Sequence, residues 1–294
     1  AFASASQDII IDAYRVENIS EQDMGLASAL AVYGYRLGLL IASSGPLLIA
    51  ELIPFAVIYQ LFALLYAGGI LITLWLVPEP LKLTRQKALT ASFWAKNYIL
   101  APLTNFITKE RALIILIFIL FFKLGDAYAG IMTNPFLLEL GFSKSEIALI
   151  VKSYGLIATL LGLAMGGYLI RQLNLFLTIS LAALAQTLTN LIFCLQAIIG
   201  YDPLFLTLTI SAENFAGGVG TVALVTYISK LCDLKFTATQ YALFSSLAAS
   251  GRTLISGSSG LAADYLNWVD FFLLTVLLSL PAFIFLLMIR KTFK

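Results

Sequence analysis

Long apolar stretches, each about the length of a membrane span, follow one another along this chain with only short polar turns between them. A helix needs about 20 apolar residues to cross a hydrocarbon core of about 30 Å. Hydrophobic residues make up 60% of the 294 residues and charged residues 12%, whereas soluble domains contain about 45–50% and about 25%. The pattern predicts an all-α polytopic membrane protein and excludes soluble, disordered and disulfide-stapled folds.

The turn residues between the apolar stretches place nine helices. Proline, glycine, asparagine and aspartate mark these turns because they favour backbone conformations that end helices. The expected helices cover about 1–14, 24–50, 53–77, 111–138, 145–170, 173–198, 204–231, 239–265 and 268–290. The first helix is short and begins at Ala1 rather than at a methionine. We therefore expect a chain that is truncated upstream.

One connection, 78–110, is much longer than the others and divides the helices into three and six. Apolar residues recur on one face of it, although Lys96 interrupts that face and Pro102 should break a helix. We expect a helix that lies on the inner membrane surface, attracted by anionic lipid. Many transporters are two six-helix halves joined by a long cytoplasmic loop. Residues 1–77 would then be the last three helices of a first half, and 111–294 a complete second half.

Lysine and arginine are distributed unevenly between the two sets of connections, which predicts the orientation of the chain. One set of connections is rich in lysine and arginine, and the other set contains little basic charge beyond Lys144. By the positive-inside rule the basic set faces the cytoplasm, and the C-terminus lies there too. The basic set comprises Arg15, Lys82, Arg85, Lys87, Lys96, Lys109, Arg111, Arg171, Lys230, Lys235, Arg290, Lys291 and Lys294.

The charge balance and the residue types exclude several classes of function. A net charge of +2 is too small to suggest a nucleic acid partner. The chain has no histidine, which removes imidazole metal sites, Ser-His triads and histidine proton relays. The two cysteines, Cys194 and Cys232, lie far apart without metal-ligand spacing around them. We therefore expect neither an enzyme nor a metal or cofactor, and any proton chemistry must be carried out by carboxylates, lysines or tyrosines.

Ionisable side chains inside the predicted spans are the candidate functional residues. Each costs roughly 2.5–3.5 kcal/mol at mid-bilayer on insertion scales, so each should face a cavity or a partner. Arg36, Lys123 and Arg252 come from three helices at similar depth, and we predict that they converge on a cavity that attracts an anionic solute. The alternative for each arginine is a structural pairing with a carboxylate. Uncharged neighbours that could bind sugar hydroxyls or amides are Gln7, Asn134, Asn214 and Gln240.

A transported proton must be carried by a carboxylate here, because the chain lacks histidine. Asp8 and Asp12 lie one helical turn apart, and like charges so placed favour a proton on one of them. Asp8 is the first choice, because we expect it to be the more buried of the two. Lys123, three residues before Asp126, should keep that carboxylate ionised, and the two could simply form an internal ion pair. Glu213 is the next candidate, with no cation within one turn.

Four motifs are spread over the length of the chain. They are Ser4–Arg15, Leu124–Ala127 with Met132–Leu138, Gly166–Arg171, and Phe236–Ala242 followed by Gly251-Arg252. The first resembles the fourth-helix signature of the AmpG-type muropeptide permeases. The next motif along the chain resembles the seventh helix of that family, and the last is similar to the start of its eleventh helix. Gly166–Arg171 resembles the loop motif after helix eight in the wider major facilitator superfamily.

The resemblance implies a twelve-helix major facilitator fold in the bacterial inner membrane, of which this chain would hold about helices 4–12. It implies proton-driven import of N-acetylglucosaminyl-1,6-anhydro-N-acetylmuramic acid, with or without peptide, for cell-wall recycling. Such fragments carry carboxylates, which agrees with the predicted cationic cavity. We expect a monomer whose partners are the solute and the lipid bilayer. The alternatives are an acetyl-CoA-type or other anionic-solute transporter of the same superfamily, or an inactive truncated paralogue.

Overall fold

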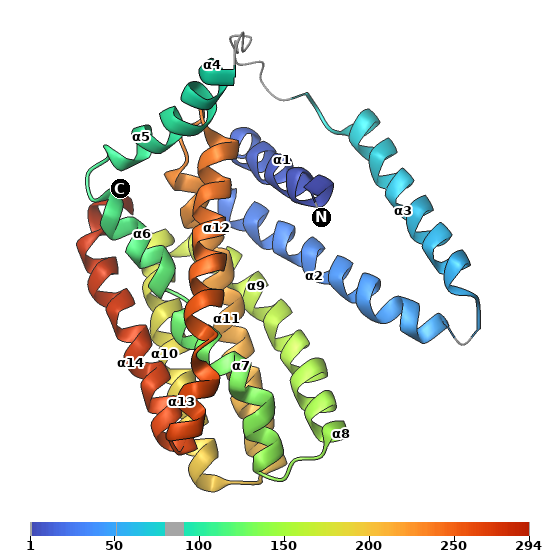
Figure 1. Ribbon diagram of the computed structural model, residues 1–294, viewed down its shortest axis with the longest axis vertical. Helices are drawn as coiled ribbons and strands as arrows, with labels where there is room; N and C mark the ends of the chain where they lie inside the picture. The colour runs from blue at the N-terminus through green and yellow to red at the C-terminus, as the bar shows by residue number, and fades with distance from the viewer. Residues whose placement is uncertain (1, 51, 80–90, 294) are drawn as a thin grey trace. The chain divides into compact units, whose positions relative to one another are not determined.

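The structure, a computed structural model, describes residues 2–50, 52–79 and 91–293, and every regular element in these ranges is a helix (Figure 1). The described chain forms two compact units. The larger unit contains the residues up to Ala29 together with those from position 91 onward, and the smaller unit contains the residues between them. The sequence-based division into 1–77, 78–110 and 111–294 stays a prediction.

Each predicted helix has a counterpart in the described residues, so the all-α prediction is confirmed. Seven helical segments of this part of the chain are long and apolar enough to cross a membrane. The first helices and the amphipathic connection are α1 (Phe2–Asn18), α2 (Met24–Ile49), α3 (Phe55–Leu76), α4 (Ala91–Ala95), the π-helical η1 (Lys96–Leu100) and α5 (Ala101–Ile107). The following helices are α6 (Ala112–Phe121), α7 (Leu124–Glu139), α8 (Lys144–Ile147), the π-helical η2 (Ala148–Tyr154), α9 (Gly155–Gln172), α10 (Leu175–Ile199), α11 (Pro203–Leu231), α12 (Thr237–Ser256), α13 (Ser259–Tyr265), α14 (Trp268–Met288) and a terminal 3-10 turn, η3 (Arg290–Phe293).

Several helices begin close to where the sequence predicts, because the side chains of the turn residues cap their first turns. The Asn174 side chain accepts a hydrogen bond from the backbone amide of Leu177 at 2.9 Å, at the start of α10. Asp202 does the same for two amides of α11, with Pro203 in the first turn. Asn267 caps α14 in the same way. These side chains satisfy amides that would otherwise lack partners, and each such cap stabilises a helix by about 1 kcal/mol.

Three of the predicted helices are interrupted, and one predicted interruption is wrong. Lys123 separates α6 from α7, a π-helical turn precedes α9, and Gly257 with Ser258 separates α12 from α13. Pro102 was expected to break the connecting helix, but α4, η1 and α5 follow one another without a gap. Pro102 lies in the first turn of α5, directly after the wider π-helical turn, where a missing N–H and the ring are tolerated. Residues 80–90 of the predicted surface segment lie outside the described residues.

Close helix contact within the larger unit depends on two glycines. A Cβ atom added to Gly218 on α11 would lie 2.6 Å from the backbone oxygen of Thr159 on α9. Gly162 on α9 faces the backbone of Phe215 on α11 just as closely. Small residues let membrane helices approach until their backbones touch, and dispersion then stabilises the pair. The glycine cluster of α11 therefore serves packing at Gly218.

Aromatic side chains fill the space between α7, α10 and α14. Phe136 and Phe272 pack edge to face with ring centroids 4.8 Å apart, and Phe193 stacks on Phe272 at 5.0 Å. All three side chains are fully buried. Trp268 covers the end of this cluster, 5.1 Å from Phe136. This aromatic core holds α7, α10 and α14 together.

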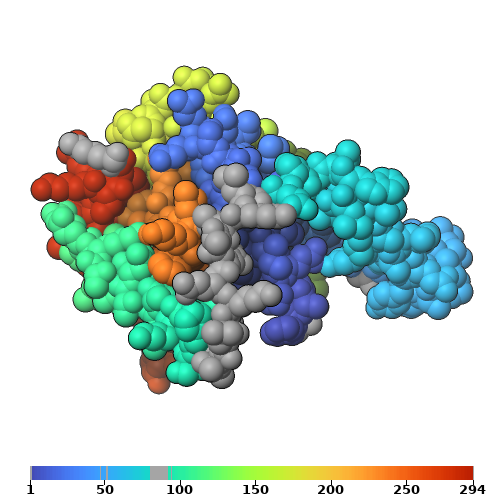
Figure 2. Space-filling view, turned by 90° about the horizontal axis from the view of Figure 1, so that it is seen from above, coloured from blue at the N-terminus to red at the C-terminus, as the bar shows by residue number. Residues whose placement is uncertain are grey.

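The start of α12 packs against the connection that precedes α6. Figure 2 shows the beginning of α12, in orange, beside the green helices α4 and α5. The buried Gln240 amide donates to the Pro102 carbonyl at 3.0 Å and to Asn105 Oδ1 at 2.9 Å. Thr239 donates to the Tyr98 carbonyl at 3.3 Å. We call this end of the larger unit, which also carries Arg171, Lys230, Lys235 and Arg290, the basic end.

Candidate functional site

Lys123 lies at the break between α6 and α7, near the middle of the apolar segment Ala112–Glu139. Its ammonium donates hydrogen bonds to the Gly217 carbonyl at 3.0 Å and to Thr221 Oγ1 at 2.8 Å, both on α11. Hydrogen bonds that involve a charged group stabilise a protein by about 1.5–3 kcal/mol each. Lys123 therefore fastens the start of α7 to α11 and places a positive charge between them.

Two carboxyl groups share the surroundings of this ammonium. Asp126 lies in the first turn of α7, and Glu213 lies on α11, close enough that its charge interacts with those of Asp126 and Lys123. The Asn214 amide donates to Glu213 Oε2 at 2.6 Å, and Thr159 donates to Asn214 Oδ1 at 3.0 Å. Four predicted residues are thus brought together, and we call them the mixed-charge cluster: Lys123, Asp126, Glu213 and Asn214.

The mixed-charge cluster contains two acids and one base, which determines what it can do chemically. With both carboxylates ionised it carries one net negative charge in a low-dielectric surrounding, which is costly. One added proton makes it neutral. Asn214 fixes the orientation of the Glu213 carboxyl through the 2.6 Å hydrogen bond and is itself held by Thr159. The arrangement suits a group that takes up and releases a single proton.

Arg36 and Arg252, the other two predicted cations, lie in different compact units of the described structure. Arg252 is half-buried on α12, within the larger unit. Arg36 is exposed on α2, within the smaller unit. The convergence of the three cations on one cavity stays a prediction.

The candidate carboxylates of α1 occupy positions opposite to those expected. Asp8 is exposed, whereas Asp12 is half-buried and forms an ion pair with Arg15 at 3.0 Å. The argument that Asp8 is the more buried of the pair is therefore wrong for the described residues. The physical reason is that only the last turns of α1, which contain Asp12, are packed against neighbouring helices, whereas Asp8 lies one turn earlier, where α1 is exposed. Gln7 is exposed beside it.

The remaining two polar candidates lie apart from the mixed-charge cluster. Asn134 is exposed on α7, two turns beyond Asp126. Gln240 is fully buried at the basic end, where its oxygen accepts from the Asp233 amide at 2.7 Å and its amide group donates to Pro102 and Asn105. These three hydrogen bonds connect α5 to the turn before α12, so the geometry gives Gln240 a structural role.

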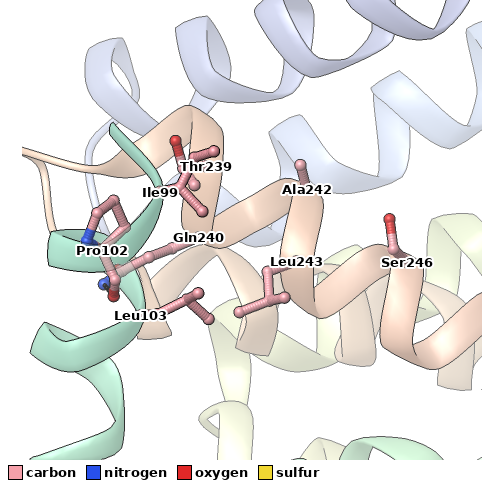
Figure 3. A pocket seen from close by; sticks show the side chains of 8 residues that line it. All are labelled: Ile99, Pro102, Leu103, Thr239, Gln240, Ala242, Leu243 and Ser246. Carbon is pink, nitrogen blue, oxygen red and sulfur yellow. Dashed lines mark hydrogen bonds between the residues drawn. The ribbon is translucent and has the colours of Figure 1, made fainter. Parts of the chain in front are cut away.

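A cavity of about 260 Å³ lies beside Gln240, between α5 and α12. Figure 3 shows its lining, with Gln240 directed toward Pro102 and the side chains of Leu103 and Leu243 facing one another across the space. Most of this lining is apolar. The cavity therefore lacks the charged groups that an anionic solute requires, and we do not assign the solute to it.

Arg15 is a site residue that the sequence pattern did not predict, because the pattern places it among the loop cations. Its side chain is 8% exposed. Arg15 Nη2 donates to Tyr241 Oη on α12 at 2.9 Å and to Ser229 Oγ on α11 at 3.5 Å, and the guanidinium lies 5.5 Å from the centre of the Tyr241 ring. An aspartate one turn before the arginine on the same face was the available signal. We call Asp12, Arg15, Ser229 and Tyr241 the basic-end cluster.

Comparison with known protein families gives one match that covers most of the chain. The family model described as Major Facilitator Superfamily matches residues 1–256. The chain is also similar to individual proteins over nearly its whole length. It is 36% identical over 295 residues to a protein of Rickettsia conorii described as putative transporter AmpG 4, and this alignment covers 99% of the chain and 70% of that protein.

A second relative has a more specific description. The chain is 34% identical over 296 residues to the anhydromuropeptide permease of Escherichia coli K12. That alignment covers all of this chain and 59% of the permease, so the chain spans less than two thirds of it. A Rickettsia bellii protein described as putative transporter AmpG 1 is 32% identical over 298 residues.

Proposed function

Because the chain belongs to the major facilitator superfamily, and within it to the AmpG-type permeases, we propose that it imports anhydro-muropeptides through the inner membrane by proton symport. The family and the apolar helices support a multi-pass membrane protein of solute transport. The substrate, N-acetylglucosaminyl-1,6-anhydro-N-acetylmuramic acid with or without peptide, and its use in cell-wall recycling are part of the proposal.

The proposal rests mainly on the mixed-charge cluster, a set of ionisable side chains within helices that can span a membrane. Charges cost several kcal/mol there, and such groups mark solute paths and proton relays in transporters. Lys123, the cation of this cluster, suits a solute with carboxylates, and so do the predicted cations Arg252 and Arg36. In this proposal Gln7, Asn134 and Asn214 add hydrogen bonds to the solute.

The coupling proton is assigned to Glu213 in this proposal, in place of Asp8. Glu213 shares one cation with Asp126, so a proton on one carboxyl neutralises the cluster. Asp8 is exposed, and Asp12 already has Arg15 as an ionic partner. Binding of a solute anion near Lys123 would change the electrostatic potential at Glu213. Solute binding and proton binding would therefore be coupled.

The test is uptake of radiolabelled anhydro-muropeptide by bacterial cells that lack their own permease and express the complete reading frame of this protein. We expect accumulation that collapses when a protonophore removes the proton gradient. Accumulation of acetyl-CoA or of another anion without muropeptide uptake would overturn the substrate. Absence of any uptake, with protein present in the membrane, would favour an inactive paralogue.

A further inference from the structure

Lys152 is a charged side chain on the surface of a helix that is apolar enough to span a membrane. It lies about a third of the way along the segment Lys144–Gln172, on the π-helical η2. The side chain is exposed, and within the part of the chain that the structure describes it forms no hydrogen bond or ion pair. Lys123, by contrast, donates two hydrogen bonds to α11. An unpaired ammonium is costly in lipid, so Lys152 needs water or an anion as its partner.

The face of the helix that carries Lys152 also contacts α2. In Figure 1, α8, η2 and α9 form one continuous yellow-green rod. Gly167 on α9 touches the start of α2, because a Cβ atom there would lie 3.2 Å from the Ala29 side chain. The positions that precede Gly167 on this face at helical spacing are 163, 160 and 156. Lys152 lies one turn before Leu156, since a π-helical turn holds more residues than an α-helical turn. Lys152 therefore shares a face with the α2 contact, nearer the other end of the rod.

The end of η2 borders the mixed-charge cluster. A Cβ atom on Gly155, directly after η2, would lie 3.1 Å from the side-chain nitrogen of Asn214. Thr159, one turn further on α9, donates to Asn214 Oδ1 at 3.0 Å, and Asn214 donates to Glu213 Oε2 at 2.6 Å. Lys152 lies within one helical turn of Gly155. Its charge is thus close to the cluster, while no carboxylate among the described residues neutralises it.

We infer that Lys152 binds a carboxylate of the transported solute, beside the mixed-charge cluster. The inference rests on the proposed function, in which the solute is an anionic muropeptide that binds where the two halves of a transporter meet. An ammonium on a flexible stem binds a carboxylate as a point charge, and no protein partner has to be displaced from Lys152 first. A solute with a free carboxylate should therefore be preferred over the same solute with an amide in its place.

The first test determines whether Lys152 borders water, and it requires no transport. Lys152→Cys is made in the complete reading frame after Cys194 and Cys232 are replaced by serine. A water-soluble methanethiosulfonate should modify it in open membrane sheets, which expose both surfaces. Ile157→Cys is the matched control, because the native side chain is 56% exposed and lies about 100° around the helix from Leu156. It should react much more slowly. An unreactive Lys152→Cys would overturn the inference and indicate an ammonium that snorkels from the lipid face to the membrane surface.

The second test measures the charge of Lys152 from a neighbouring position. Ser153→Cys, also exposed, is treated with negatively charged sulfonatoethyl and positively charged trimethylammonioethyl methanethiosulfonate. The ratio of the two rates should favour the anion. Lys152→Gln should lower this ratio at least about threefold, because one unit charge nearby is lost, and Lys152→Arg should preserve it. An unchanged ratio in Lys152→Gln would overturn the inference.

The third test measures solute preference. The free acid and the carboxamide of the peptide-free anhydro-disaccharide compete for uptake by cells that lack their own permease. The wild-type protein should prefer the acid, and Lys152→Gln should reduce that preference at least about tenfold, as expected for one lost ionic hydrogen bond. Lys152→Arg should keep most of it, and Lys230→Ala, which removes an exposed cation at the basic end, should keep all of it. Equal preference in wild type and Lys152→Gln would overturn the inference. Absence of uptake by the wild type would count against the proposed function alone, because the two cysteine tests are independent of it.

Discussion

At the residue scale, the charged and polar side chains of the spans differ in how far they stabilise the fold through hydrogen bonds to other parts of the protein. Lys123 donates to two acceptors on α11, so the fold depends on its charge. The Gln240 side chain likewise forms three hydrogen bonds within the protein. Arg252 is half-buried on α12, beside Gly251, where α12 packs against Leu120 of α6. Removal of the charge should lower the stability of the protein where the side chain stabilises the fold. It should lower only solute uptake where the side chain binds solute.

Replacement of Arg252 by Gln should reduce uptake at least tenfold while the amount of protein in the membrane changes little. One lost ionic hydrogen bond to the solute costs about 1.5–3 kcal/mol, which is a factor of roughly 10–150 in binding. Lys123→Gln is the matched comparison, and it should lower both uptake and the melting temperature because it loosens α7 from α11. Initial uptake rates divided by membrane protein give the comparison. Equal loss of protein and uptake in Arg252→Gln would assign Arg252 to structural pairing.

Glu213→Gln should abolish concentrative uptake and preserve exchange of labelled for unlabelled solute at zero gradient. The amide keeps the shape and the contact with Asn214, but it cannot take up or release a proton. Asp8→Asn, on the exposed face of α1, should retain concentrative uptake. Both fluxes can be measured in proteoliposomes with and without an imposed proton gradient. If Asp8→Asn loses accumulation and Glu213→Gln keeps it, the sequence-based choice of Asp8 is restored.

The identity of the candidate residues could be predicted from insertion cost alone, but their partners could not. Asp126, Glu213 and Lys123 are candidates because charges are costly in a bilayer, and the structure gathers them with Asn214. That gathering depends on which faces of α7 and α11 meet, and single-sequence patterns do not contain this. Arg15 was misplaced because it stands at the end of its apolar stretch, where a loop cation and a buried cation have the same sequence pattern.

At the element scale, the helix ends could be predicted closely and the internal breaks could not. The expected helices 173–198 and 204–231 correspond to α10 and α11 within two residues. Their ends are set by local chemistry, since Asn174 and Asp202 cap the first turns. The break at Lys123 instead follows from hydrogen bonds to another helix, so hydropathy along the chain gives no sign of it.

The contact of α9 with α11 predicts opposite outcomes for two neighbouring glycines. Gly218→Ala should destabilise the protein by about 1–3 kcal/mol, because the new methyl group collides with the α9 backbone at Thr159 and Gly162. Gly217→Ala meets open space and should leave stability unchanged or slightly higher, since alanine favours a helix over glycine. Thermal unfolding of the detergent-purified variants, followed by size-exclusion profiles, measures this. Equal melting temperatures for the two would contradict the close approach of α9 and α11.

At the scale of the whole molecule, composition and charge asymmetry determine fold class and suggest orientation. The apolar stretches could lead only to a helical bundle, because unpaired backbone groups are too costly in lipid. Which helices pack against one another is a different matter, because sequence periodicity does not distinguish helices of similar hydropathy. The orientation of the bundle is open to a direct measurement.

Labelling of single cysteines by a membrane-impermeant maleimide on intact cells should reach Lys144→Cys and miss Lys235→Cys. Both side chains are exposed, so access differs only through the side of the membrane, which the lysine and arginine asymmetry sets. The native thiols should give little background, since Cys194 is buried and burial raises the pKa of Cys232 to about 12. At pH 7.5 the reactive thiolate of such a group is on the order of 0.01% or less. Lys235→Cys should become labelled once the cells are permeabilised. Labelling of Lys235→Cys but not Lys144→Cys in intact cells would invert the topology and place the basic end on the outer side.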